Sequence, residues 1–221
     1  AGALGNAGRL GVIAEFKRAS PSEGLIAPDT DPVEVARAYE AAGAAAMSVL
    51  CCERDFHGSL VDLARVRRAV DLPLLAKDFT VDPWQITEYR AHGADVVLLI
   101  LALLDDLTAR SLTAAATDLG METLAEVHDE AELNRAVELG CPIIGVNARN
   151  LATLKIDLDE QRRLVALVPA DRVAIAESGI NTATEARLAR DAGAGGVLVG
   201  TGVMRRPDLL AELVAVGREA E

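Results

Sequence analysis

Short apolar runs alternate with longer amphipathic segments along the chain, and polar residues follow the apolar runs at one end only. The run at 72–75 contains Pro73, is too short for a helix and leads to Lys77. Burial disfavours the charged form of a lysine, so a lysine at the end of a dry strand favours a functional role. Other apolar runs end in Glu15-Phe16-Lys17, in Glu126-Val127-His128, in Asn147-Ala148-Arg149 and in Glu177-Ser178-Gly179. The pattern predicts buried strands that carry titratable groups at the same end.

A glycine closes four of the amphipathic segments just before the next apolar run begins. These glycines are Gly43, Gly93, Gly140 and Gly193, which lie about 50 residues apart. Glycine at such a junction takes the left-handed conformation that ends a helix. An interval of two strand–helix units between them indicates a regular α/β array.

Filling in the alternate units gives eight strands and eight helices. The strands are expected at 12–16, 46–50, 73–77, 95–100, 123–127, 142–146, 173–177 and 196–200. The helices are expected at 32–43, 59–70, 83–93, 105–119, 129–139, 159–168, 182–192 and 207–219. This alternation predicts an α/β fold, a single (β/α)8 TIM barrel with eight parallel strands. A doubly wound open sheet is the alternative, but it usually has fewer strands and less even spacing. No linker divides the chain, so residues 1–221 are predicted to form one domain.

The amino-acid composition limits which binding partners and which cellular compartment are expected for the protein. The formal net charge of −12 argues against nucleic acid, because a phosphate backbone needs a basic face. No apolar run is long enough to span a membrane, and no signal peptide precedes the first strand. The three cysteines form no disulfide framework, which suits a reducing compartment. We therefore expect a cytoplasmic protein without a nucleic-acid or membrane partner, as a monomer or weak homodimer.

The polar residues at the strand ends are predicted to form one site, because a (β/α)8 barrel places its active site at the carboxyl ends of its strands. Glu15 and Lys17 are two residues apart, so an extended chain directs both to the same side. Backbone amides at Ser178-Gly179 and at Gly200-Thr201-Gly202 follow the last two strands, where such barrels bind phosphate. The histidines have no metal-ligand spacing, and His128 is expected to support Glu126 or to begin a helix.

Several motifs together resemble one family, indole-3-glycerol phosphate synthase of tryptophan biosynthesis. They are the run Ile13-Ala14-Glu15-Phe16-Lys17-Arg18-Ala19-Ser20-Pro21-Ser22, Lys77-Asp78-Phe79 with Asp82-Pro83, Glu126-Val127-His128, Gly145-Val146-Asn147-Ala148-Arg149-Asn150-Leu151, and Ala176-Glu177-Ser178-Gly179-Ile180. The resemblance extends from about Val12 to Asp208. It implies a carboxy-lyase that converts 1-(2-carboxyphenylamino)-1-deoxyribulose 5-phosphate to indole-3-glycerol phosphate, with loss of CO₂ and water and with no metal or organic cofactor.

The resemblance also implies roles for individual residues. Lys77 would be the general acid on the substrate carbonyl oxygen, and Glu126 its acid–base partner. Lys17 would pair with the anthranilate carboxylate and serve as an acid in the dehydration step. Glu15 and Glu177 would orient the lysines and the substrate hydroxyls. The remaining implied contacts are Asn147 and Arg149 to the anthranilate part, Phe79 as an apolar wall, and Ser20, Ser178, Gly179, Gly200 and Thr201 to the phosphate.

Two departures from the family pattern keep alternatives open. Family members usually begin earlier, with a helical arm over the barrel mouth, so residues 1–11 are expected to be the remnant of an arm or linker. Cys51-Cys52 stands where the family has a threonine followed by an acidic residue. An impaired or non-catalytic phosphate-binding relative is therefore one alternative. A phosphoribosylanthranilate isomerase-like enzyme is another, although the two lysines at the first and third strands argue against it.

Overall fold

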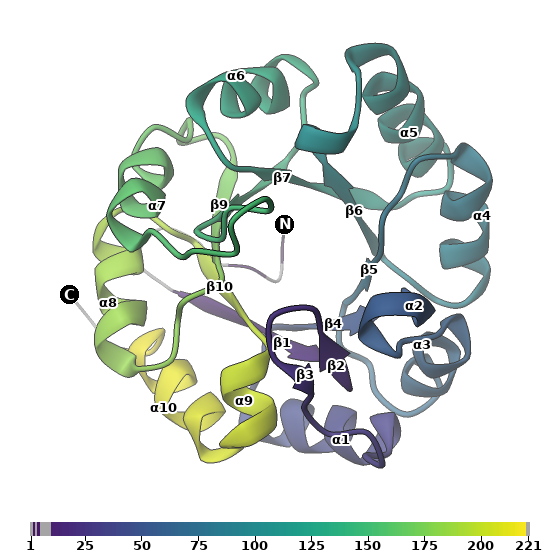
Figure 1. Ribbon diagram of the computed structural model, residues 1–221, viewed down its shortest axis with the longest axis vertical. Coiled ribbons are helices and arrows are strands. Elements are labelled where there is room, and N and C mark those ends of the chain that lie inside the picture. Colours follow the sequence, from purple (N-terminus) through teal and green to yellow (C-terminus); the bar gives the residue numbers. More distant parts are fainter. Residues whose placement is uncertain (1, 3, 5–9, 220–221) are drawn as a thin grey trace.

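Eight parallel strands form a closed barrel in the computed structural model, which describes residues 2, 4 and 10–219 (Figure 1). The strands are β1 (Gly11–Phe16), β4 (Ala46–Leu50), β5 (Leu74–Lys77), β6 (Val96–Ile100), β7 (Glu122–Val127), β8 (Ile143–Asn147), β9 (Val173–Glu177) and β10 (Gly196–Val199). The barrel closes where β1 pairs with both β10 and β4. The (β/α)8 prediction is confirmed, and each expected strand lies within one residue of the observed one.

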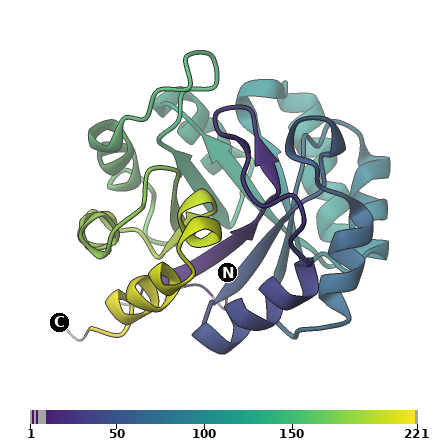
Figure 2. The same ribbon diagram turned by 60° about the horizontal axis from the view of Figure 1, so that its bottom comes forward.

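A ring of helices covers the outside of the barrel (Figures 1 and 2). Its members are α1 (Pro32–Ala42), α3 (Leu60–Arg67), α4 (Pro83–Ala91), α5 (Asp106–Asp118), α6 (Glu130–Glu138), α7 (Leu158–Val165), α8 (Ala183–Asp191) and α10 (Asp208–Val216). All expected helices are present, with ends displaced by at most three residues. No helix among the described residues has the length and apolar character needed to cross a membrane.

Local capping explains where these helices begin and end. Seven residues accept a hydrogen bond from a backbone N–H of the first turn: Asp31, Ser59, Asp82, Asp105, Asp129, Asp157 and Thr182. Each such cap stabilises its helix by about 1 kcal/mol. The four glycines predicted to close helices all have positive φ, from 74° at Gly140 to 106° at Gly193, which confirms their predicted conformation.

Five short elements were not expected, and all lie in connections that leave the carboxyl ends of strands. They are the hairpin strands β2 (Ala19–Ser20) and β3 (Gly24–Leu25), the helices α2 (Glu53–Phe56) and α9 (Thr201–Arg205), and the 3₁₀ turn η1 (Leu101–Leu103). Segments of two to five residues are too short to show a hydrophobic period. In Figure 2 the β2–β3 hairpin, drawn in purple, stands at this end of the barrel.

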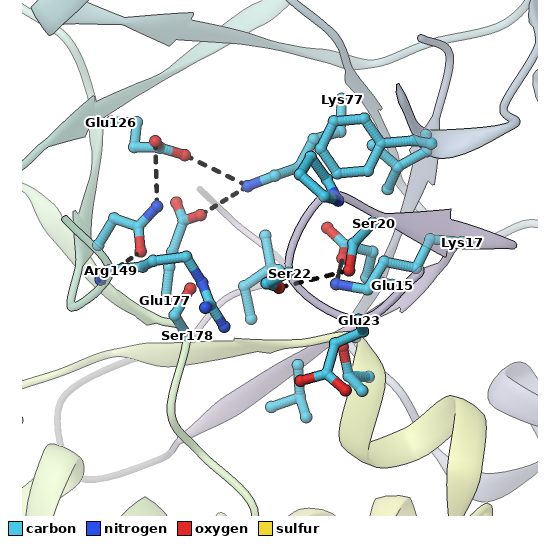
Figure 3. A pocket seen from close by; sticks show the side chains of 18 of the residues that line it. Glu15, Lys17, Ser20, Ser22, Glu23, Lys77, Glu126, Arg149, Glu177 and Ser178 are labelled. Atoms are coloured by element: carbon cyan, nitrogen blue, oxygen red, sulfur yellow. Dashed lines mark hydrogen bonds and ion pairs between the residues drawn. The ribbon is translucent and has the colours of Figure 1, made fainter. Parts of the chain in front are cut away.

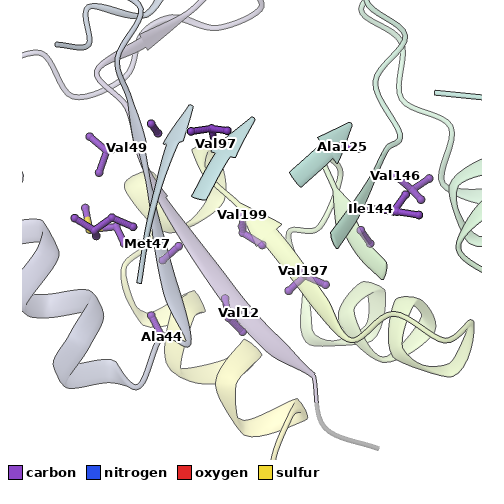
Figure 4. Packing of buried hydrophobic residues seen from close by; sticks show 14 of the residues in the cluster. Val12, Ala44, Met47, Val49, Val97, Ala125, Ile144, Val146, Val197 and Val199 are labelled. Atoms are coloured by element: carbon purple, nitrogen blue, oxygen red, sulfur yellow. The ribbon is translucent and has the colours of Figure 1, made fainter. Parts of the chain in front are cut away.

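The barrel wall separates two apolar cores. The larger one lies between strands and helices, and Figure 4 shows Val12, Val49 and Val199 among its members. The smaller one fills the barrel with Ile13, Ala46, Leu75, Leu98, Leu124, Ile143, Ile175 and Leu198, together with Leu4. Since side chains alternate along a strand, the residue two positions beyond each interior residue also faces inward, toward the mouth.

The predicted arm remnant at 1–11 is only partly described. Residues 1, 3 and 5–9 lie outside the described residues, and β1 begins at Gly11. Leu4 is buried in the inner core, with 7% of its surface exposed. The assignment of 1–11 to an arm or linker stays a prediction.

Candidate active site

A pocket of about 560 Å³ lies at the carboxyl ends of the strands. Every predicted site residue lines it: Glu15, Lys17, Ser20, Lys77, Phe79, Glu126, Asn147, Arg149, Glu177, Ser178, Gly179, Gly200 and Thr201. Figure 3 shows the labelled side chains converging from β1, the β2–β3 hairpin, β5, β7 and β9. The closed barrel thus brings together residues that are far apart in sequence.

Lys77 lies between two buried carboxylates (Figure 3). Its Nζ is 2.7 Å from Glu177 Oε2 and 3.3 Å from Glu126 Oε2, and 16% of the side chain is exposed. Burial alone would lower the pKa of Lys77, but the negative charges of Glu177 and Glu126 outweigh it and raise the pKa above its ordinary value. Lys77 is therefore an ammonium group near neutral pH, and the two carboxylates fix the position of the protons that it carries.

The carboxylates of Glu126 and Glu177 differ in how many hydrogen-bond donors surround them. Glu126 also accepts from Asn147 Nδ2 at 3.1 Å and lies 3.4 Å from His128 Nε2. Burial would raise the pKa of Glu126, but Lys77 and these neighbours lower it below its ordinary value. Glu177 Oε1 has no hydrogen-bond partner among the described residues, so burial keeps the pKa of Glu177 raised. Glu126 is thus held in its ionised form more strongly than Glu177, although both carboxylates are paired with the Lys77 ammonium group.

His128 bridges Glu126 to helix α6. Its Nδ1 is 3.1 Å from Glu132 Oε2, and its backbone N–H donates to the same oxygen at 2.8 Å. Burial would lower the pKa of His128, but the two carboxylates outweigh it and raise the pKa to about 9. His128 therefore supports Glu126, which is one of the two roles expected from its position; it does not begin the helix, because α6 starts at Glu130 with Asp129 as its cap.

Lys17 and Glu15 form the second polar pair of the pocket. Lys17 Nζ is 2.9 Å from Glu15 Oε1, and Ser48 Oγ donates to Glu15 Oε2 at 3.4 Å. Burial would raise the pKa of Glu15, but Lys17 and Lys77 lower it. A Cβ at Gly200 would come 2.3 Å from Glu15 Oε1 and 2.9 Å from Lys17 Nζ. The absence of a side chain at Gly200 therefore makes room for this pair.

A second glycine makes room for Glu177. A Cβ at Gly145 would lie 2.0 Å from Glu177 Oε1 and 2.7 Å from Leu124 Cδ2. Below the carboxylate, Gln161 Nε2 donates to the backbone oxygens of Glu177 and Val146, at 2.6 and 2.9 Å. Gln161 is buried, so it joins β8 and β9 where these strands end.

Asn147 and Arg149 border the pocket from the loop after β8. Asn147 Oδ1 accepts from the backbone N–H of Arg149 at 2.9 Å, and Arg149 Nη1 donates to the Leu154 oxygen at 3.1 Å. Figure 3 shows the Arg149 side chain directed into the pocket. The apolar side of the mouth is formed by Phe79, which is 41% exposed and lies 6.4 Å from the ring of Phe56.

Backbone groups and hydroxyls collect at the opposite side of the pocket. Ser178 has φ 66°, which is uncommon outside glycine, and Gly179 follows with φ 79°. Ser20 lies on the β2–β3 hairpin, and its Oγ is 3.5 Å from Ser22 Oγ. Donors of this kind suit a phosphate group. No group of three or more His, Cys, Asp or Glu side chains that could hold a metal ion occurs in the described part of the chain.

The cysteines that depart from the family pattern lie at the end of β4. Cys51 is buried, which raises the pKa of its thiol, whereas Cys52 lines the pocket. All three cysteines of the chain are free.

Several residues that line the pocket or support its lining residues were not found from the sequence. Ser48 and Gln161 are buried polar residues that hold Glu15 and the β8–β9 ends. Ser48 could have been found, because it interrupts the apolar run at 46–50 on the inward side. Glu23 and Arg205 line the pocket and pair at 2.8 Å, but nothing in the sequence pattern connects them.

Comparisons with known proteins agree on one family. The family model "Indole-3-glycerol phosphate synthase" matches residues 3–216. The indole-3-glycerol phosphate synthase of Rhodococcus jostii (strain RHA1) is 51% identical over 211 residues, covering 94% of this chain and 78% of that protein. The enzyme of the same name from Nocardioides sp. (strain ATCC BAA-499 / JS614) is 55% identical over 198 residues, covering 89% and 76%.

Solved structures of low identity share the fold alone. Thiamine phosphate pyrophosphorylase from Pyrococcus furiosus superimposes with a TM-score of 0.71 at 17% identity, covering 96% of both chains. A mandelate oxidase mutant with benzaldehyde gives a TM-score of 0.70, also at 17% identity, covering 91% of this chain and 71% of that one. The barrel is therefore shared widely, whereas the match of sequence is specific: the chain belongs to the indole-3-glycerol phosphate synthase family.

Proposed function

We propose that the chain converts 1-(2-carboxyphenylamino)-1-deoxyribulose 5-phosphate to indole-3-glycerol phosphate through the residues assembled at the barrel mouth. The observation that supports this most directly is Lys77, an ammonium group held between Glu126 and Glu177. Ring closure needs a proton donor for the substrate carbonyl oxygen, and a positioned donor of this kind contributes about 10²–10⁴-fold to a rate.

In the first step the aromatic carbon that bears the carboxylate attacks the substrate carbonyl carbon. Lys77 gives its proton to the carbonyl oxygen as the new C–C bond forms. The carboxylate then leaves as CO₂, and its bonding electrons return to the ring. Glu126, ionised beside Lys77, stabilises the positive charge that develops on the substrate nitrogen in this step.

In the last step the new hydroxyl leaves as water and a ring proton is lost. Lys17 is the proposed donor to the departing hydroxyl, with Glu126 as the proton acceptor. Glu15 holds Lys17 in place at 2.9 Å. Glu177 holds Lys77 in place in the same way. The carboxylates of Glu15 and Glu177 can also accept hydrogen bonds from substrate hydroxyls.

The remaining groups bind the two ends of the substrate. Asn147, Arg149 and Phe79 are the proposed contacts for the anthranilate part, because they supply an amide, a cation and an apolar ring to the lining of one pocket. The phosphate is assigned to the hydroxyl and amide groups of Ser20, Ser178, Gly179, Gly200 and Thr201.

Formation of the fluorescent indole product by the purified chain tests the activity, and Lys77→Met tests the mechanism. We expect turnover to fall by at least 10²-fold in this variant, while inorganic phosphate still binds. Lys155→Met is the matched control, since Lys155 is exposed and is the chain's third lysine. Unchanged turnover of Lys77→Met would remove Lys77 from its role, and phosphate binding without product in the wild type would favour the non-catalytic alternative.

Location and assembly are also part of the proposal. Three free cysteines suit a reducing compartment, which supports action in the cytoplasm. The proposed state is a monomer or weak homodimer. Sedimentation at several protein concentrations tests it, and a dimer that persists on dilution to nanomolar concentration would contradict it.

A further inference from the structure

At their formal charges, the ionisable residues that line the pocket are more negative than positive. The cations that line it are Lys17, Lys77, Arg149 and Arg205. The carboxylates are Glu15, Glu23, Asp78, Glu126 and Glu177. Four positive charges against five negative ones leave a formal charge of −1, although the proposed substrate carries a phosphate and a carboxylate. Binding such an anion is easier if a pocket cation is released from its carboxylate partner.

Of the three pocket cations that are paired with a carboxylate, Lys17, Lys77 and Arg205, the last is released most easily. Lys17 and Lys77 are paired with carboxylates that are 1–5% exposed. Arg205 Nη2 instead lies 2.8 Å from Glu23 Oε2, and the two side chains are 54% and 35% exposed. Exposed ion pairs contribute little to stability, because water solvates the separated charges well. A phosphate dianion, which can accept two hydrogen bonds from one guanidinium, can displace a single exposed carboxylate.

The position of Arg205 in α9 directs it to the side of the pocket that holds the backbone donors. Arg205 follows Thr201 by four residues in this helix, so the two side chains share one helix face. Helical side chains lean toward the N-terminal end of their helix, which brings Arg205 toward Thr201. Glu23 lies in the turn of the β2–β3 hairpin, between Ser22 and Gly24. The pair therefore joins the two segments that border the phosphate side.

We propose that Arg205 is a phosphate-recognition residue that Glu23 holds at the mouth of the pocket and yields to the substrate phosphate on binding. This inference rests on the proposed function, since it needs a phosphorylated substrate. Glu23 acts as a competitor for Arg205, so it sets the affinity for the phosphate group without taking part in the chemistry.

The test compares Arg205→Gln, Glu23→Gln and the double variant, in turnover and in calorimetric titration with inorganic phosphate. Arg205→Gln should raise KM and the Kd for phosphate about tenfold, with kcat within about twofold of the wild type. Glu23→Gln should lower both constants about threefold. In the double variant this gain should shrink, because the cation that Glu23 competes for is gone.

The neighbouring pair Arg206–Glu212 provides the matched controls. Arg206 Nη1 lies 3.0 Å from Glu212 Oε1, and neither residue lines the pocket. Arg206→Gln and Glu212→Gln change the same charges close by, so they should leave KM and the Kd for phosphate within about twofold.

Each outcome separates the inference from the proposed function. Equal phosphate affinity of the wild type and Arg205→Gln, or a loss of kcat at unchanged KM, would overturn the inference while indole formation by the wild type left the activity standing. Absence of indole formation with a tenfold loss of phosphate affinity in Arg205→Gln would overturn the proposed activity and retain the phosphate-recognition role.

Discussion

Gly145→Ala is expected to damage catalysis more than stability. The new Cβ would lie 2.0 Å from Glu177 Oε1, whereas ordinary contact begins at 3.4 Å, so the carboxylate must move by the difference, about 1.4 Å. A shift of that size along the Lys77–Glu177 hydrogen bond would lengthen it from 2.7 Å to about 4.1 Å, beyond hydrogen-bonding reach. Displacement of a positioned group by about 1 Å can cost 10²-fold in rate.

The cost in stability should be smaller. Overpacking a core by one methyl group costs about 1–3 kcal/mol, and the added Cβ would also lie 2.7 Å from Leu124 Cδ2. We therefore expect kcat to fall about 10²-fold and the free energy of unfolding to fall by about 2 kcal/mol. Indole fluorescence measures the first quantity, and urea denaturation measures the second.

Gly193→Ala is the control for loss of stability alone. Gly193 is exposed, has φ 106°, and has open space where a Cβ would lie. Alanine there is strained by about 1–2 kcal/mol, but it touches nothing in the pocket. Its kcat should stay within twofold of the wild type. If Gly145→Ala kept kcat within threefold, the position of the Glu177 carboxylate would not matter for catalysis and the reasoning would be refuted.

Two further predictions concern ion pairs around the pocket. His128→Gln should lower the free energy of unfolding by about 2 kcal/mol at pH 6 after allowing for partial solvent screening, since the pKa of His128 is raised to about 9. The protonated His128 stabilises the fold fully below about pH 6.5, and this stabilisation is lost as the pH rises through 9. The difference in unfolding free energy between the wild type and His128→Gln should therefore vanish near pH 10. Arg18→Met should cost about 3 kcal/mol in urea denaturation, because it leaves the buried carboxylate of Asp62 unpaired. Arg18→Met with Asp62→Asn should recover part of that loss.

A different result would contradict each of these two predictions. A His128→Gln difference that is the same at pH 6 and pH 10 would show that packing, and not charge, is lost. If adding Asp62→Asn destabilised the Arg18→Met protein further, the unpaired carboxylate would not be the source of its instability.

The barrel fold, and the inward-facing position of polar residues at the carboxyl ends of its strands, could be predicted because both depend on local periodicity. Lys77 lies two residues beyond Leu75, and Glu126 lies two beyond Leu124. An inward-facing apolar residue therefore indicates that the polar residue two positions later also faces inward. The closing glycines and capping aspartates are equally local, so the helix ends were predictable to within a few residues.

The residue pattern alone could not predict which side chains pair, because pairing depends on distances across the barrel; the partners proposed for Lys77 came from the family resemblance. The position of Lys77 required a nearby carboxylate, but two contact it, and the difference between them comes from Asn147 and His128. Pairing of Glu23 with Arg205 depends on the heights of a hairpin and a five-residue helix above the mouth. Neither element has a periodic signal in the sequence.

Residues along each strand alternate between inward and outward positions. A deletion within a strand therefore has very different consequences from a substitution or a longer loop. Deleting one residue between Leu75 and Lys77 would turn the ammonium group outward toward the helices, although nearly every amino acid would be retained. Substitutions and longer loops leave the parity of each strand intact. New substrate preferences in such a barrel should therefore arise through exchanged side chains and remodelled loops, while insertions and deletions within the strands are eliminated.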